Sequence, residues 1–333
     1  MRPHPHITIL LRQAHDERRC ATVTNHADRM AMLRRRAEGS IISPYPGLYI
    51  DTEYWSSLNP TQQTLHIARA LATLHPDWVF AGPTAAAFLG LEHQWTIHRS
   101  GLYIADRRNG SSPPAPVQPP RSPNAPRATI NRIYMSSVPV IGCGDVTVTS
   151  PARTLIDCVE LLQFRHTLPL FDSAFAASLA TADDIRTMCR GLRRDRTPVD
   201  RMLQYVNPLH DNGGESFAYG TMAEEGLALP VVQHTFQHPN KPGVRYRADF
   251  TWFLSGGRIV VAEYDGMAKY VDPSMTDRRT IEAVVAKQSA RERDLFEMGV
   301  GHIERLTYDD VVRRQPMVEK LLRAGIPRYG RPW

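Results

Sequence analysis

The chain has 333 residues, which is enough for two or three domains that each bury a core of their own. Hydrophobic residues make up 42% and charged residues 22%, values ordinary for a soluble globular protein, and no apolar run reaches the roughly 20 residues of a membrane span. The formal net charge of +6 permits nucleic-acid binding without requiring it.

The start of the chain and its cysteines indicate a reducing compartment. The first residues lack the small-residue cleavage site of a signal peptide. The four cysteines are scattered and form no C-x-x-C pair, which argues against a zinc ribbon and against a disulfide framework. We therefore expect a cytoplasmic protein with reduced thiols.

The N-terminal part of the chain has the pattern of two helices followed by a short two-stranded ribbon. Helical spacing covers residues 7–16 and 27–38, Thr24-Asn25 offers an N-cap for the second helix, and a strand follows at 48–50. This order is that of a winged helix-turn-helix. We therefore expect residues 1–58 to form a winged-helix DNA-binding domain.

Basic residues are concentrated on the second of these helices, and an aromatic residue lies at the tip of the ribbon. An arginine-rich helix end suits contacts to phosphates and to guanine edges. Two alternatives stay open: the charges can form a solvated face, or the helices can form a hairpin docked on the next domain. The predicted DNA-binding residues are Arg29, Arg34, Arg35, Arg36 and Tyr45.

Residues 59–206 predict a mixed α/β region. Residues 106–127 within it hold seven prolines and cannot bury enough apolar surface to fold alone, so we expect a long loop there. The other expected elements are helices at 61–74 and 84–91, strands at 96–104 and 129–134, a strand, proline and helix over 147–157, and helical structure to about 192.

Residues 207–333 begin at a polar, glycine-containing break and predict a separate domain. The pattern gives the order helix, three strands, long helix, strand and final helix. These elements are expected at 215–226, 231–236, 244–253, 258–264, 275–298, 302–307 and from 309 onward.

Acidic residues interrupt the apolar runs of the second and third strands, where an unpaired charge is costly. If Ser255-Gly256-Gly257 forms a three-residue loop, Asp249 lies opposite Glu263, and Asp265 shares their face. A two-residue Gly-Gly loop instead pairs Asp249 with Tyr264, and the sequence leaves both registers open. Opposed carboxylates about 5 Å apart need a cation between them or a retained proton.

Further charged residues surround this hairpin. Glu215 opens the preceding helix, where it suits the helix dipole or supplies an added contact to a metal or water. Lys269 and Lys287 are candidate cations for a phosphate or a developing charge. Arg291, Arg293 and Asp294 on the long helix are expected to belong to a solvated lattice of charges.

Residues 215–310 resemble the restriction-endonuclease-like, PD-(D/E)XK superfamily, and more narrowly its very-short-patch-repair-like branch, DUF559. The resemblance implies that Asp249 and Glu263 hold Mg²⁺, which activates a water for attack on a phosphodiester, with Glu215 assisting. Asp265 stands where the superfamily usually has lysine, and many DUF559-like sequences share this acid. The matching motifs are Glu215, Arg247-Ala-Asp249-Phe, Val261-Ala-Glu263-Tyr-Asp265-Gly266, and Arg291-Glu-Arg-Asp-Leu with Gly299.

Residues 1 to about 200 resemble the AbiEi-type antitoxins of type IV toxin–antitoxin systems. The resemblance implies binding to promoter DNA, repression, and a cognate toxin as a partner. The matching segments are Pro46-Gly-Leu-Tyr49, Gly82-Pro-Thr-Ala-Ala-Ala-Phe-Leu-Gly-Leu91 and Val148-Thr-Ser-Pro-Ala-Arg-Thr-Leu-Ile-Asp157.

The expected fold is thus a multidomain α+β or α/β protein: a winged helix, a mixed middle region and a restriction-endonuclease-like αβββαβ domain. We predict a DNA-binding, antitoxin-like regulator whose nuclease-like domain is inactive or used for binding. The alternative is an active Mg²⁺-dependent endonuclease with catalytic residues Glu215, Asp249, Glu263, Asp265, Lys269 and Lys287, in which Asp249, Glu263 and Asp265 bind the metal. No nucleotide-binding glycine loop and no G-x-S-x-G elbow supports a small-molecule enzyme.

Overall fold

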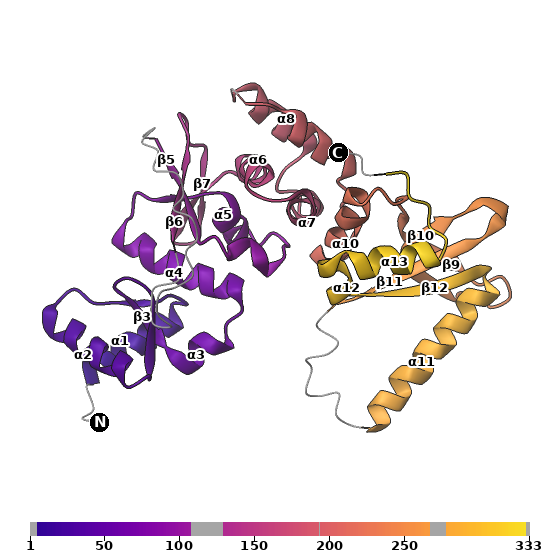
Figure 1. Ribbon diagram of the computed structural model, residues 1–333. Coiled ribbons are helices and arrows are strands. Elements are labelled where there is room, and N and C mark those ends of the chain that lie inside the picture. Colours follow the sequence, from indigo (N-terminus) through magenta and orange to yellow (C-terminus); the bar gives the residue numbers. More distant parts are fainter. Residues whose placement is uncertain (1–4, 108–128, 193, 267–277, 331–333) are drawn as a thin grey trace. The chain divides into compact units, whose positions relative to one another are not determined.

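The structure is a computed structural model that describes residues 5–107, 129–192, 194–266 and 278–330. Within these ranges it is a mixed α+β protein with thirteen α-helices and three sheets, and none of the helices described is both long and apolar enough to cross a membrane. The chain divides into two compact units, residues 1–162 with 178–199, and residues 163–177 with 200–333 (Figure 1). The finer division predicted at residues 58 and 206 stays a prediction.

The first unit begins with two helices and a small sheet of strand order β1-β3-β2. The side chain of Asn25 accepts the backbone N–H of Asp28 and so caps the second helix, as expected. Ile7, Met32 and Ile41 meet in a core between the helices and the sheet. The elements are α1 (Pro5–Asp16), β1 (Ala21–Thr22), α2 (His26–Ala37), β2 (Ile41–Tyr45) and β3 (Leu48–Asp51).

A five-stranded sheet of order β6-β5-β4-β8-β7 forms the rest of this unit, with helices around it. The strand predicted at 96–104 is wrong in its first half, where Trp95–His98 form a turn of 3₁₀ helix. The predicted proline-rich loop lies outside the described residues from 108 onward. The elements are α3 (Thr52–Ser57), α4 (Pro60–Leu74), β4 (Val79–Phe80), α5 (Gly82–Phe88), β5 (Leu102–Asp106), β6 (Ile130–Tyr134), β7 (Val140–Cys143), β8 (Val146–Thr149), α6 (Pro151–Leu161) and α8 (Ala182–Arg190).

The second unit is built on a four-stranded sheet of order β12-β11-β10-β9, in which β11 and β12 are parallel and the other pairs antiparallel. The predicted order helix, three strands, long helix, strand from residue 215 is confirmed. The elements are α7 (Phe164–Ala176), α9 (Thr197–Tyr205, across the boundary), α10 (Gly213–Glu224), β9 (Val231–Gln237), β10 (Arg245–Phe253), β11 (Ile259–Asp265), α11 (Arg278–Glu297), β12 (Val300–Thr307), α12 (Tyr308–Arg313) and α13 (Gln315–Arg323).

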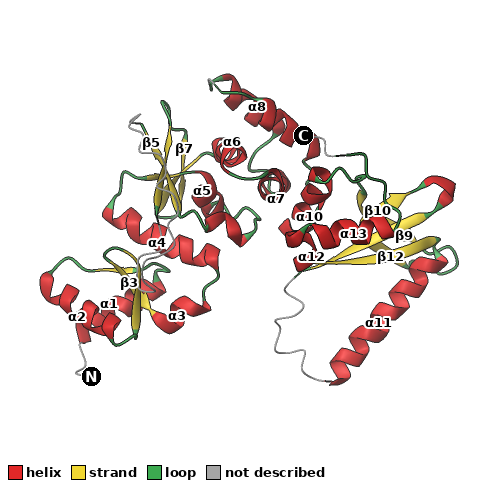
Figure 2. Cartoon of the chain, in the orientation of Figure 1, coloured by secondary structure: helices red, strands yellow, loops and turns green. Residues whose placement is uncertain are grey.

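Helices cover both faces of this sheet, with α10, α12 and α13 on one side and α11 on the other (Figures 1 and 2). Val260 and Ala262 pack in the larger core with α10, α12 and α13, whereas Val261 packs in a smaller core with Leu295 of α11. Because side chains alternate along a strand, Glu263 follows Val261 onto the α11 face. The acids of β11 therefore lie under α11.

The turn between β10 and β11 decides the register of the acids. Ser255–Gly257 form the loop, Gly256 and Gly257 both have positive φ, and Leu254 N–H bonds to the carbonyl of Arg258 at 2.8 Å. Glycine adopts these conformations without the steric cost that other residues bear. The three-residue alternative is therefore confirmed, and the ladder pairs Phe250 with Ala262.

A charged side chain fastens α7 within the second unit, although the sequence placed α7 in the middle region. The guanidinium of Arg165 lies 4.8 Å from the ring centre of Phe217 on α10 and donates to the carbonyl of Val311. Gly220 lets the two helices approach, because a Cβ there would stand 3.0 Å from the Cα of Arg165. These contacts link residues that are far apart in the sequence.

Gly214 in the first turn of α10 lies against the ring of Tyr264 on β11, and this contact leads to a stability prediction. A Cβ at Gly214 would overlap the ring of Tyr264, at 2.8 Å from Cζ. We expect Gly214→Ala to destabilise the protein by about 1–3 kcal/mol, as overpacked cores do. Chemical denaturation measures the difference.

Gly266→Ala is the matched control, because its Cβ would meet the same ring at an ordinary 3.6 Å. Equal stability of the two variants would show that α10 does not depend on the absence of a side chain at residue 214.

Candidate functional site

Three carboxylates from three elements converge on the second unit: Glu215 from α10, Asp249 from β10 and Glu263 from β11. Burial, together with the neighbouring charge of Asp249, raises the pKa of Glu263 to about 7, against the lowering effect of Arg291 and Arg305. Burial also raises the pKa of Glu215, and Asp249 contributes in the same direction. Asp249 thus acts on both glutamates, and the cluster attracts cations.

Asp249 lies where the two central strands part. The ladder between β10 and β11 ends at Phe250 and Ala262, and at the next step Asp249 Oδ2 accepts the backbone N–H of Tyr264 at 2.8 Å. A side chain thus replaces the backbone carbonyl as the partner of this amide. The same register places Glu263 across from Asp249, as the three-residue loop predicts.

Glu215 is buried, and donors from its own turn and from β9 hold it. Its Oε2 accepts the backbone N–H of Asp211 at 2.9 Å and Gln233 Nε2 at 2.7 Å, and its Oε1 accepts Asn212 Nδ2 at 2.7 Å. A carboxylate offers about four acceptor positions. Glu215 is therefore fixed in place and retains acceptor capacity for one more partner.

Arg291 of α11 supplies a cation to this cluster. Its Nη2 donates to Glu263 Oε1 at 2.8 Å and to the carbonyl of Arg247 at 2.7 Å, and its guanidinium lies 5.9 Å from the ring centre of Tyr246. The prediction of a solvated lattice is wrong for Arg291 and Asp294, because α11 packs on the sheet and turns both residues toward it, whereas Arg293 is exposed as expected. Spacing along one helix gave no signal for this long-range contact.

Asp265 has a different environment from the other acids. It is buried at the end of β11, and its Oδ2 accepts Arg305 Nη1 at 3.3 Å. Arg305 pairs with Glu263 in the β11–β12 register and donates its Nη2 to Glu292 at 2.6 Å. Arg305 therefore stands between Asp265 and the acids of α11, and it adds positive charge beside Glu263.

Gln233 was not predicted, although a polar residue directly after the apolar pair Val231-Val232 was an available signal. The β9–β10 register pairs Ala248 with His234 and Phe250 with Val232, which places Gln233 across from Asp249. Its amide nitrogen bonds to Glu215, while its Oε1 is buried and has no hydrogen-bond partner among the described residues.

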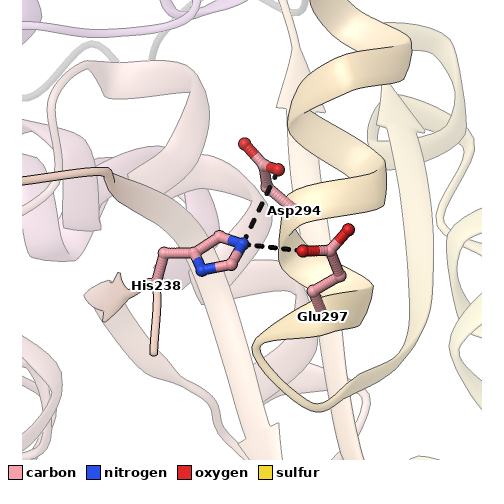
Figure 3. A group of neighbouring side chains, drawn as sticks. All are labelled: His238, Asp294 and Glu297. Atoms are coloured by element: carbon pink, nitrogen blue, oxygen red, sulfur yellow. Dashed lines mark hydrogen bonds and ion pairs between the residues drawn. The ribbon is translucent and has the colours of Figure 1, made fainter. Parts of the chain in front are cut away.

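A second group of possible metal ligands consists of His238, Asp294 and Glu297 (Figure 3). His238 Nε2 lies 2.9 Å from Glu297 Oε2 and 3.8 Å from Asp294 Oδ1. Its Nδ1 accepts the backbone N–H of Asn240, so Nε2 carries the ring proton and donates to Glu297. A histidine that binds a metal through Nε2 would instead donate from Nδ1.

Lys241 already supplies the positive charge to this second group, through ion pairs with Asp294 and Glu297. The hydroxyl of Tyr246 also donates to Asp294 Oδ2 at 2.8 Å. We therefore interpret the group as a charge network that fastens the end of α11 to the β9–β10 turn. That network keeps α11 above the sheet and so keeps Arg291 close to Glu263.

The remaining predicted residues divide between described and undescribed positions. Lys269 lies outside the described residues, and Lys287 lies on α11 with a side chain that is also outside them. Arg29, Arg34 and Arg36 are exposed on α2, and Tyr45 is half-buried in β2.

Arg35 is half-buried on α2 and donates to Thr8 Oγ1 at 3.2 Å. The described residues supply no acid that forms an ion pair with any of the four arginines of α2. Within the part of the chain that the structure describes, no ion pair neutralises these four charges.

Comparison with known proteins gave no match, whether the chain was scanned against protein-family models, curated proteins or solved structures.

The raised pKa of Glu263 leads to a prediction on pH. Its folded value of about 7 exceeds the ordinary 4.5, so its contribution to stability is complete below pH 4.5 and is lost as the pH rises through 7. Glutamine does not ionise, so we expect Glu263→Gln not to show this loss. The free energy of unfolding of the variant, relative to that of the wild type, should therefore rise by about 2–3 kcal/mol between pH 4.5 and 8. Denaturation at a series of pH values measures the gain.

Glu319→Gln, at an exposed glutamate of α13, is the control and should follow the wild type throughout. If the Glu263 variant loses as much stability as the wild type over this range, Glu263 does not carry a raised pKa.

Proposed function

We propose that this chain is a DNA-binding regulator of the AbiEi antitoxin type, which contacts DNA through helix α2. The observation that carries the proposal is the row of arginines on α2, three of them exposed and none in an ion pair with a described acid. Arginine forks match phosphate oxygens and the edges of guanine. The proposed winged-helix identity of the N-terminal elements rests on the sheet order β1-β3-β2 beside two helices.

The same arginines could have a purely structural role in stabilising helix α2. Arg34, Arg35 and Arg36 lie in the last turn of α2, where cations favour the negative end of the helix dipole. That role does not account for Arg29, which lies in the first half of the helix and is exposed. The hairpin of β2 and β3 follows directly and brings Tyr45 to the turn, in keeping with a wing.

We expect Arg34→Ala, Arg35→Ala, Arg36→Ala in one variant to weaken binding to duplex DNA and to flatten its salt dependence. Each lost phosphate contact should lower the slope of log Kobs against log[salt] by about 0.9. Fluorescence anisotropy with labelled promoter DNA at several salt concentrations measures both.

A matched control replaces Arg186, Arg190 and Arg196 by alanine. The first two lie on α8 and the third follows it, so the control removes the same number of positive charges from another part of the chain. If both triple variants lose affinity equally, α2 is not the contact surface and only net charge matters.

A second candidate function is supported by the convergent carboxylates. We propose that the second unit is a restriction-endonuclease-like domain of the DUF559 type, whose site takes up a divalent cation such as Mg²⁺. Carboxylate oxygens are among the ligands that Mg²⁺ prefers, and Asp249 and Glu263, which the strand register places across from each other, provide them. When bound, the ion would supply an activated water and neutralise charge on a phosphodiester.

The chain's own residues define the other parts of such a site. Asn212, Gln233 and the turn before α10 hold Glu215 in a fixed orientation. Glu263, with a pKa raised to about 7, can accept a proton near neutral pH. Asp265 stands where a lysine is usual and pairs with Arg305, so Arg291, beside Glu263, is the cation that we propose faces a phosphate.

We expect the double variant Asp249→Asn, Glu263→Gln to bind promoter DNA as the wild type does and to lose all Mg²⁺- or Mn²⁺-dependent cleavage. The two functions then depend on different units. Gel shift and cleavage of supercoiled plasmid measure the two properties on one preparation.

If the wild-type protein never cuts duplex or single-stranded DNA with either ion, the proposed endonuclease function is wrong and the proposed regulator function is unaffected. Cleavage that persists in the double variant would place the active site elsewhere.

A further inference from the structure

Gln233 has a backbone conformation that the fold of β9 does not call for. Its φ is 53°, in the left-handed region that residues with a Cβ rarely adopt. Four described residues other than glycine have positive φ, and of these Gln233 alone lies inside a strand. Strain of this kind persists where the surroundings fix it, and it occurs often at ligand sites.

The side chain of Gln233 is only half satisfied by the protein. Nε2 donates to Glu215 Oε2 at 2.7 Å, which fixes the orientation of the amide. Oε1, on the same carbon, is buried and has no hydrogen-bond partner among the described residues. A buried acceptor without a donor is unfavourable. The strand therefore carries two unfavourable features at one residue, across from Asp249.

A purely structural role accounts for only part of this arrangement. Holding Glu215 explains the contact of Nε2, but it explains neither the unpartnered oxygen nor the strained backbone. An ammonium or guanidinium would satisfy Oε1, yet Arg291 donates to Glu263 and to the carbonyl of Arg247. The other described cation beside Glu263, Arg305, donates to Asp265 and Glu292. A divalent cation is the other partner that accepts a neutral amide oxygen alongside carboxylates.

We propose that Gln233 Oε1 is a ligand of the divalent cation held by Asp249 and Glu263, and that the strained conformation of β9 exists to present it. The proposal rests on the nuclease-like site proposed above and adds a neutral ligand to it. Glu215 then acts as the acceptor that orients the amide, which gives the buried acid a positioning role.

The test compares Gln233→Gly with Gln237→Gly in the full chain. Both replace a glutamine of β9 by glycine, but Gln237 is exposed and has no positive φ. Titration calorimetry with Mn²⁺ measures affinity, and the thermal midpoint is measured in EDTA. We expect Gln233→Gly to weaken Mn²⁺ binding roughly tenfold or more, with a midpoint no lower than that of Gln237→Gly, because glycine relieves the strain.

Gln233→Asn is a second variant, which separates loss of the ligand from misfolding. Asparagine tolerates the left-handed conformation and differs from glutamine only in its shorter side chain. We expect it to keep the wild-type midpoint and to lose Mn²⁺ affinity. Unchanged Mn²⁺ affinity in both Gln233 variants, together with binding abolished by Asp249→Asn, Glu263→Gln, would overturn the role of Gln233 and leave the carboxylate site intact. If the wild type itself binds no Mn²⁺, both the site and the inference fail.

Anomalous diffraction from crystals soaked in Mn²⁺ decides between an ion and a water at the amide oxygen. The expected result is a manganese peak about 2.0–2.6 Å from Gln233 Oε1 and in contact with Asp249. A peak on the carboxylates with only a water on Oε1 would overturn the proposal.

Discussion

The crowding of buried negative charge at the ends of β10 and β11 is the constraint on which the second unit depends. Asp249 raises the pKa of both Glu215 and Glu263, so the three acids cannot all be ionised and dry without positive charge and donors nearby. The backbone of Tyr264, the amides of Asn212 and Gln233, and the guanidinium of Arg291 meet this need from four parts of the chain. The local structure is organised by that requirement.

Helix α11 is held to the sheet by charge as much as by apolar contact. Leu295 is its buried apolar residue in the small core, while Asp294 and Glu297 bind Lys241 and His238 of the β9–β10 turn. This fastening is independent of the carboxylate cluster. Arg291 can therefore exchange Glu263 for another anion without releasing the helix, a useful property if the cluster takes up a divalent cation.

The two proposed functions use opposite charge on different units. Arginines without acidic partners on α2 suit a polyanion directly, whereas buried acids repel one unless a cation mediates. A regulator needs only the arginines that bind DNA, whereas a nuclease needs both these arginines and the acids with their cation. In the proposed nuclease-like site Asp265 stands where a lysine is usual, and Arg305 pairs with that acid.

The sequence alone determined the features that depend on near neighbours. The glycines at 256 and 257 limited the hairpin to two registers, and the structure selected the one that pairs Leu254 with Arg258 and so places Asp249 across from Glu263. The order of elements after residue 215 followed from the same local periodicity. Only the tertiary structure decided which cation meets Glu263, since Arg291 lies 28 residues away on a helix whose packing direction its own pattern did not reveal. The same holds for the strained Gln233, which meets Glu215 18 residues away, and for α7, which joins the second unit through Arg165. Such contacts depend on how separate elements pack, because a burial penalty exists only after the chain has closed around the charge.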